Sequence, residues 1–222
     1  MFFKFTHLYQ FNVKLFVLLI PIILFSDQLA AKETKVLILG DSLSAAYGIS
    51  QAEGWVSLLQ DMWQESQITV VNAAISGETS DGALARLPRL LVQHQPTHIY
   101  VELGGNDGLQ GHPIDKMVNN LSEIIELSKA NGSIVFLQSM QIPTNYGKRY
   151  TDMFNSAYQT LATKYQIPLI PFFLQQIALD PSLMQRDGIH PNAEAQILIA
   201  KDMQNILMDL ILTSRTDNNQ LN

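Results

Sequence analysis

The sequence predicts an α/β fold, a three-layer α/β/α sandwich with a parallel five-stranded sheet. Two observations support this prediction. Short apolar runs of four to six residues alternate along the chain with longer stretches whose apolar residues recur at helical spacing. Strands that alternate with helices form a parallel sheet that is covered on both faces. We see no internal repeat and no linker, so we expect one domain.

The five expected strands are apolar runs bounded by turn residues. The first of them is wholly apolar and leads directly into Gly40, which predicts a strand buried on both faces. In chain order, the expected strands are residues 36–39, 68–71, 98–103, 134–137 and 169–173.

The expected helices carry an apolar stripe on one face. Pro88 is expected to kink the second helix. Gly132 is placed to end the third helix, and Asn192 can cap the last one. In chain order, the expected helices are residues 54–64, 81–93, 114–130, 151–165 and 193–212.

The first 31 residues have the layout of a secretory signal peptide. Lys4 and Lys14 supply positive charge, residues 15–25 are apolar, and Leu29-Ala30-Ala31 offers small residues for cleavage. The apolar run is shorter than the roughly twenty residues of a membrane-spanning helix, although an uncleaved anchor is the alternative. We therefore expect a periplasmic or secreted protein, cleaved near Ala31 and left without a stable membrane anchor.

Composition limits the function of the remaining chain. Residues 32–212 can form one domain around a single core, and the polar residues 213–222 are expected to be a flexible tail. The absence of cysteine excludes disulfides, a thiolate nucleophile and a cysteine-ligated metal. Loss of the leader changes the formal net charge from −6 to −7. An acidic domain without a basic cluster argues against nucleic-acid binding.

The motif Gly-Asp-Ser-Leu-Ser at residues 40–44 follows the first expected strand. Gly40 allows a sharp turn because it has no Cβ. Ser42 then lies at the carboxyl edge of the sheet, where open α/β sheets bind ligands. Taken alone, the motif also fits an ordinary loop whose Ser and Asp cap a helix.

Three further turns follow expected strands and converge on the same edge. His190 can act as a general base towards Ser42, and Asp187 can accept the Nδ1 hydrogen of His190. The backbone N–H groups of Ser42 and Gly77, with the side-chain amide of Asn106, would supply three donors to an oxyanion. Each turn alone is more often structural, so the prediction depends on their convergence.

Four sequence blocks occur in a fixed order: Gly-Asp-Ser-Leu-Ser, Ser-Gly-Glu-Thr, Gly-Gly-Asn-Asp and Asp-Gly-Ile-His-Pro-Asn. They resemble the blocks of the SGNH (GDSL) hydrolase family, and the resemblance covers essentially the whole mature chain. It implies a flavodoxin-like sheet and Ser42 as the nucleophile. It also implies Gly77 and Asn106 in the oxyanion hole, and Asp187 with His190 completing a catalytic triad.

No cofactor or metal is expected. His94 and His98 are four residues apart, but Pro96 between them is incompatible with a helical metal-binding pair. The sequence also lacks the Gly-x-Ser-x-Gly elbow of other α/β hydrolases.

We therefore expect a monomeric serine hydrolase that cleaves small-molecule acyl esters and thioesters, such as aryl esters, lysophospholipids and acyl-CoA. The alternatives are a carbohydrate O-acetylesterase on the same fold and a non-catalytic binding module. A lipid-type hydrolase needs a groove for the acyl chain, whereas ordinary loop packing is the alternative role of its candidate residues. The candidates are Leu109, Ile142, Pro143, Tyr146 and Ile189.

Overall fold

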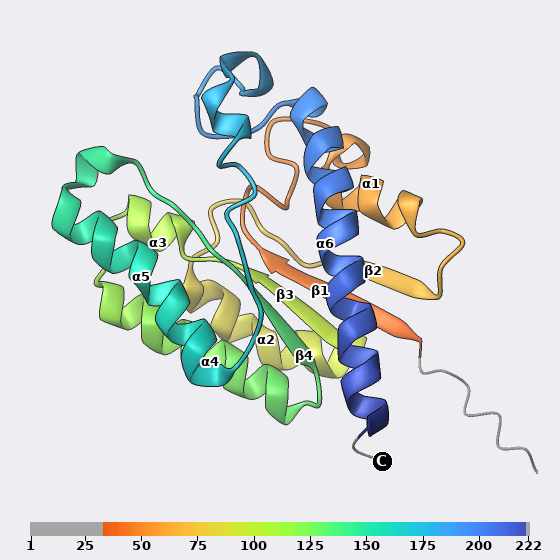
Figure 1. Cartoon of the computed structure of the whole chain (residues 1–222). Helices are drawn as coiled ribbons and strands as arrows, with labels where there is room; N and C mark the ends of the chain where they lie inside the picture. Colours follow the sequence, from red (N-terminus) through yellow and green to blue (C-terminus); the bar gives the residue numbers. More distant parts are fainter. Residues whose placement is uncertain (1–32, 221–222) are drawn as a thin grey trace, which may run out of the picture. The chain divides into compact units, whose positions relative to one another are not determined.

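The protein is described by a computed structural model that covers residues 33–220, and the expected signal peptide and its cleavage site lie outside the described residues. Five parallel strands form one sheet in the order β2-β1-β3-β4-β5 (Figure 1). This order is that of flavodoxin-like sheets, so the predicted fold class is confirmed. The strands are β1 Thr34–Gly40, β2 Ile68–Asn72, β3 His98–Glu102, β4 Ile134–Gln138 and β5 Leu169–Ile170.

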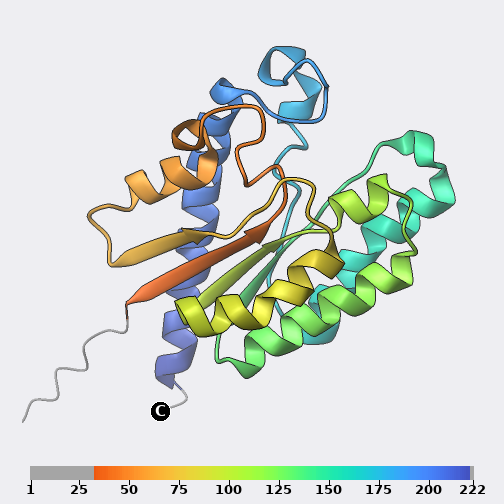
Figure 2. The same cartoon turned by 180° about the vertical axis from the view of Figure 1, so that it is seen from behind.

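Helices cover both faces of the sheet, as Figures 1 and 2 show from opposite sides. On one face α1 (Trp55–Met62) packs against α6 (Ala193–Gln220). On the other face α4 (Ile114–Ala130) lies between α2 (Ser80–His94) and α5 (Lys148–Tyr165). Among the described residues, no helix combines the length and apolarity needed to cross a membrane.

Large side chains fill the space between the layers. On one face the ring of Trp55 meets that of Tyr100 edge to face, with centroids 5.8 Å apart. Within α5, Phe154 and Tyr158 meet in the same way at 5.5 Å. All four of these side chains are fully buried. Residues 36–39 are also fully buried, which is why the first strand reads as a continuous apolar run rather than as an alternating one.

Two elements differ from the sequence prediction near the carboxyl edge. β5 ends at Ile170 because Pro171, which follows it, has no N–H to donate to the ladder. The glycine-rich stretch after β3 forms a short helix, α3 (Gly105–Leu109), instead of an open turn. Short 3₁₀ helices occur in some of the other described loops: η1 Gln51–Glu53, η2 Thr144–Tyr146, η3 Ile177–Leu179 and η4 Pro181–Leu183.

The last helix is longer than predicted, since the residues expected to form a tail from position 213 are helical as far as Gln220. α6 continues to Gln220 because its last turns contact the amino ends of two strands. The Ser214 hydroxyl lies 3.1 Å from His98 Nε2. Arg215 donates to the hydroxyl of Thr34 at 2.5 Å.

The strand order reverses between β1 and β3, because β2 lies on one side of β1 and the later strands lie on the other. Open α/β sheets bind ligands at the carboxyl ends of the strands beside such a reversal. The loop that follows β1 there carries Ser42, and the short helix α3, which follows β3, carries Asn106. The topology therefore predicts a site at this edge.

Candidate active site

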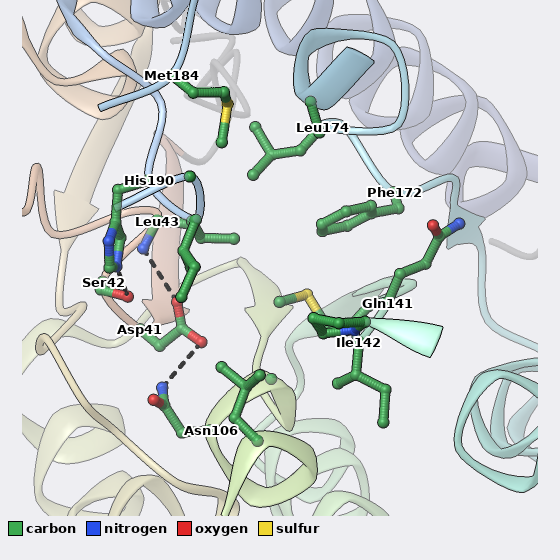
Figure 3. Close-up of a pocket in the computed structure, with 17 residues that line it drawn as sticks. Asp41, Ser42, Leu43, Asn106, Gln141, Ile142, Phe172, Leu174, Met184 and His190 are labelled. Carbon is green, nitrogen blue, oxygen red and sulfur yellow. Dashed lines mark hydrogen bonds between the residues drawn. The ribbon is translucent and has the colours of Figure 1, made fainter. Parts of the chain in front are cut away.

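Ser42 lies in an irregular loop, residues 41–50, that we call the Ser42 loop. The first turn of this loop is closed by Ser44 N and Ala45 N, which both donate to Asp41 O, at 3.3 and 3.0 Å. The turn leaves Ser42 half-buried. Its Oγ lies 2.9 Å from His190 Nε2 (Figure 3), which is the contact that a serine and a general base require.

Asp187 approaches the other side of the imidazole. Its Oδ2 lies 2.7 Å from His190 Nδ1, while its Oδ1 accepts the backbone N–H groups of Ile189 (2.9 Å) and His190 (3.0 Å). Burial alone would raise the pKa of Asp187, but the two backbone donors and His190 outweigh it and lower the pKa to about 2. Asp187 is therefore ionised at neutral pH and can hold a hydrogen on Nδ1.

Tyr47 packs against the His190 ring, and Gln185 bonds the backbone on both sides of that contact. Neither residue was predicted from the sequence. The Tyr47 ring lies on the imidazole with centroids 4.3 Å apart. Gln185 Nε2 donates to Tyr47 O at 2.7 Å and to Pro191 O at 3.1 Å. Gln185 thus joins the Ser42 loop to the loop at residues 184–192, which we call the His190 loop. No local signal could have identified it, since a loop glutamine has no motif of its own.

Gly77 lies in a tight turn after β2. Glu78 N donates to Ile75 O at 3.1 Å, and Gly77 has a φ of +78°, a conformation that favours glycine. Ile75 N donates to Gly40 O at 3.1 Å and so ties this turn to the end of β1. Within the described part of the chain, neither Ser42 N nor Gly77 N donates a hydrogen bond, which leaves both N–H groups available to a ligand.

The amide group of Asn106 points to protein acceptors. Its Nδ2 donates to Glu78 O at 2.9 Å and to Asp41 Oδ2 at 3.1 Å. Asp41 Oδ1 accepts the backbone N–H of Leu43 at 3.0 Å. One amide therefore links the Ser42 loop, the Gly77 turn and α3. No role in the active site was predicted for Asp41, although its position directly before Ser42 was a usable signal.

A cavity of about 320 Å³ opens beside Ser42 and His190 (Figure 3). Asp41 and Asn106 line it on the polar side. Among the described residues, Gly77 and Tyr146 are outside its lining. The Tyr146 hydroxyl instead donates to Leu109 O at 2.8 Å. The expected groove residues that do line the cavity are Leu109, Ile142, Pro143 and Ile189.

Most of the remaining apolar wall comes from the chain after β4 and β5, and Leu43 of the Ser42 loop adds to it. This part of the wall was missed, because residues 174–184 show no periodicity and read as a loop, while Phe172 was placed in the fifth expected strand. In Figure 3 Met184 and Leu174 face the cavity from the side opposite Ile142. The added lining side chains are Met140, Phe172, Leu174, Ala178 and Met184. No group of three or more potential metal-ligating side chains occurs among residues 33–220.

Comparisons with known proteins point to one class of enzyme. The GDSL-like Lipase/Acylhydrolase family matches residues 38–196. A protein of Escherichia coli K12 named thioesterase 1/protease 1/lysophospholipase L1 is 47% identical over 190 residues, which cover 86% of this chain and 90% of that protein. An arylesterase of Vibrio mimicus is 46% identical over 187 residues, covering 82% and 94%.

Solved structures agree with the sequence comparisons. A crystal structure of the psychrotrophic esterase EstA from Pseudoalteromonas sp., inhibited by monoethylphosphonate, matches with a TM-score of 0.78 at 47% identity. That match covers 80% of this chain and 98% of the esterase. The chain therefore belongs to the GDSL-like lipase/acylhydrolase family and is a serine hydrolase.

Proposed function

We propose that the protein hydrolyses acyl esters and acyl thioesters through an acyl-enzyme formed on Ser42. The observation that carries the proposal is the series of close contacts from Asp187 through His190 to Ser42 Oγ, on the wall of an apolar cavity. In this assignment Ser42 is the nucleophile and His190 the general base. Asp187 orients the imidazole and stabilises its protonated form.

The reaction proceeds in two halves. His190 Nε2 takes the proton of Ser42 Oγ as that oxygen attacks the acyl carbonyl carbon, and then passes it to the departing alcohol or thiol. The acyl group is left on Ser42. His190 next takes a proton from water, whose oxygen attacks the acyl carbon. The same proton returns to Ser42 Oγ as the carboxylic acid departs.

Three donors are proposed to stabilise the oxyanion: Ser42 N–H, Gly77 N–H and the Asn106 amide. The first two have no acceptor among the described residues. The amide hydrogen of Asn106 that now points to Asp41 would turn to the oxyanion, while its bond to Glu78 O is kept.

The size of the cavity favours substrates with acyl chains of medium length. The cavity has a volume of about 320 Å³ and is lined by apolar side chains such as Leu109, Ile142 and Leu174, so it has room for an acyl chain longer than acetyl. The relatives named thioesterase, lysophospholipase and arylesterase support ester and thioester substrates. An O-acetylesterase would leave most of this apolar volume unused.

A series of p-nitrophenyl esters, kept below micelle formation, tests the proposal. We expect kcat/KM to rise by at most about fourfold per added CH₂, since each contributes up to about 0.8 kcal/mol. The rise should level off at acyl groups of medium length, when the cavity is full. A series that is highest for acetyl would favour the acetylesterase. A fluorophosphonate probe should label Ser42 alone, and labelling of another serine would overturn the mechanism.

We also propose that residues 1–31 direct export and are removed near Ala31, leaving a monomer outside the cytoplasm without a membrane anchor. The charge, length and small-residue end of the leader support this. Intact-mass measurement of the exported protein checks it, and a full-length chain in the membrane fraction would favour the uncleaved anchor.

A further inference from the structure

A buried carboxyl group lies beneath the Ser42 loop, and the proposed reaction does not use it. Glu102, the last residue of β3, is 0% exposed. Its Oε2 accepts hydrogen bonds from Asp41 N at 3.2 Å and from Ser44 Oγ at 2.8 Å. Asp41 precedes Ser42 directly and Ser44 follows it by two positions, so Glu102 holds the chain on both sides of the nucleophile.

The space that this carboxyl occupies explains why Gly40 begins the motif. Gly40 is the register partner of Glu102 on the neighbouring strand. A Cβ on Gly40 would lie 2.7 Å from Glu102 Oε2 and 3.0 Å from Ser44 Oγ, both closer than ordinary van der Waals contact. Glu102 therefore accounts for three of the five motif residues. It leaves no room for a side chain at Gly40, and it accepts hydrogen bonds from Asp41 N and Ser44 Oγ.

Glu102 is best accounted for as a neutral acid. Its Oε1 is buried and has no hydrogen-bond partner among the described residues, which would be costly for a carboxylate. Burial, and then the negative charge of Asp41, raise the pKa of Glu102 well above its usual value. The titratable groups that face it are Asp41, Tyr100 of β3 and Tyr158 of α5, none of which is positively charged.

We infer that Glu102 is a positioning residue, whose neutral carboxyl group fixes the Asp41 backbone and the Ser44 hydroxyl and thereby directs Ser42 Oγ at His190. The inference rests on the proposed function, because it takes Ser42 to be the nucleophile. It deepens that proposal by assigning a group that acts through Ser42 and is not in the cavity lining.

Three variants test the inference. Glu102→Gln keeps the shape, the neutral charge and an oxygen that accepts both hydrogen bonds, so kcat should stay close to that of the wild type. Glu102→Leu removes both bonds, and the displaced serine should lower kcat by about 10²-fold with little change in KM. Ser44→Ala removes one of the two bonds and should cause a smaller loss of kcat.

Tyr100→Phe is the matched control. It removes a buried hydrogen bond from the same strand, that of Tyr100 to Gln138 at 2.7 Å, without removing a bond to the Ser42 loop. We expect it to lower stability and to leave kcat unchanged.

The loss of kcat without a change in KM is the readout that a structural role alone would not move, and the stability difference between the wild type and Glu102→Gln reports whether Glu102 is neutral in the fold. In the unfolded chain Glu102 loses its proton near its usual pKa of 4.5, whereas in the folded protein it keeps the proton to a higher pH. The wild type should therefore lose stability relative to Glu102→Gln as pH rises above 4.5, until Glu102 ionises in the fold. Urea unfolding across this range measures the difference.

The outcomes separate this inference from the proposed function. A wild-type protein without esterase activity, or without a labelled Ser42, would overturn the proposed function and this inference together. An active wild type with full kcat in Glu102→Leu, or in Ser44→Ala should the leucine variant not fold, would overturn the positioning role alone. A Glu102→Gln variant as impaired as Glu102→Leu, with a flat stability difference, would show that Glu102 acts as a carboxylate.

Discussion

At the scale of single residues, Asn106 exchanges one of its hydrogen-bond acceptors in the proposed reaction. Both of its acceptors, Glu78 O and Asp41 Oδ2, are in place before substrate binds. The bond to Glu78 O fixes the side chain. The other amide hydrogen, which is proposed to bind the oxyanion, is donated to Asp41 Oδ2. The amide is thus held in position and exchanges one acceptor for another.

Asn106→Ala should lower kcat by about 10²–10³, the usual cost of losing one oxyanion donor, with KM nearly unchanged. Steady-state kinetics with a medium-chain ester measures both constants. Asn120→Ala is the matched control, because Asn120 also bonds through its amide, to Ser80 Oγ at 3.0 Å, but is not in the cavity lining. A loss confined to KM would show that Asn106 binds the ground state instead.

At the scale of elements, two loops from opposite ends of the chain must stay in register for Ser42 and His190 to meet. The Ser42 loop follows β1, and the His190 loop precedes α6. Gln185 connects them through its bonds to Tyr47 O and Pro191 O. Gln185 N also donates to His190 O at 2.8 Å, so a shift of this residue moves the imidazole.

Gln185→Leu removes both side-chain donors at similar size, and kcat should fall by up to about 10²-fold, because small misplacements of reacting groups are costly. Gln185→Glu should be impaired as well, since a carboxylate cannot donate to the two carbonyl groups. Gln159→Leu is the control, on an exposed part of α5 where the Gln159 side chain donates to Thr163 Oγ1. Unchanged kcat in Gln185→Leu would show that the two loops hold their positions without this link.

At the scale of the whole described domain, the active site and the contacts made by the end of α6 lie at opposite ends of the strands. The loops of the site leave the carboxyl ends of the strands, while the end of α6 contacts the amino ends of β1 and β3 through Arg215 and Ser214. Burial, with the charge of Arg215 second, lowers the pKa of His98 to about 4. His98 is therefore neutral at pH 7 and can be buried there.

Truncation after Leu212 should lower the free energy of unfolding by about 1–3 kcal/mol, because Thr34 and His98 lose their partners. kcat/KM should be unaffected at temperatures where the protein stays folded. Truncation after Thr216 is the control, since it keeps both contacts. Equal stability of the two truncated proteins in urea would mean that the contacts contribute nothing, and a loss of kcat in the folded protein would mean that the two edges are coupled.

Much of the fold and part of the site could be predicted because their signals are local. The alternation of apolar runs and amphipathic stretches determined the parallel sheet and the approximate bounds of its elements. The four blocks identified Ser42, Gly77, Asn106, Asp187 and His190, and parallel strands bring their carboxyl ends to one edge. The structure places Ser42, Asn106 and His190 around one cavity, with Asp187 behind the imidazole.

Other features were decided only by the tertiary structure, because their partners are distant in sequence and have no pattern of their own. Glu102 meets Asp41 across 61 positions, and Gln185 meets Tyr47 across 138. The end of α6 reads as a polar tail until Thr34 and His98 provide its contacts. By itself the sequence determined which residues have the chemistry. The folded chain decided which groups hold them in place and how large a cavity they face, because hydrogen bonds and packing depend on distance in space.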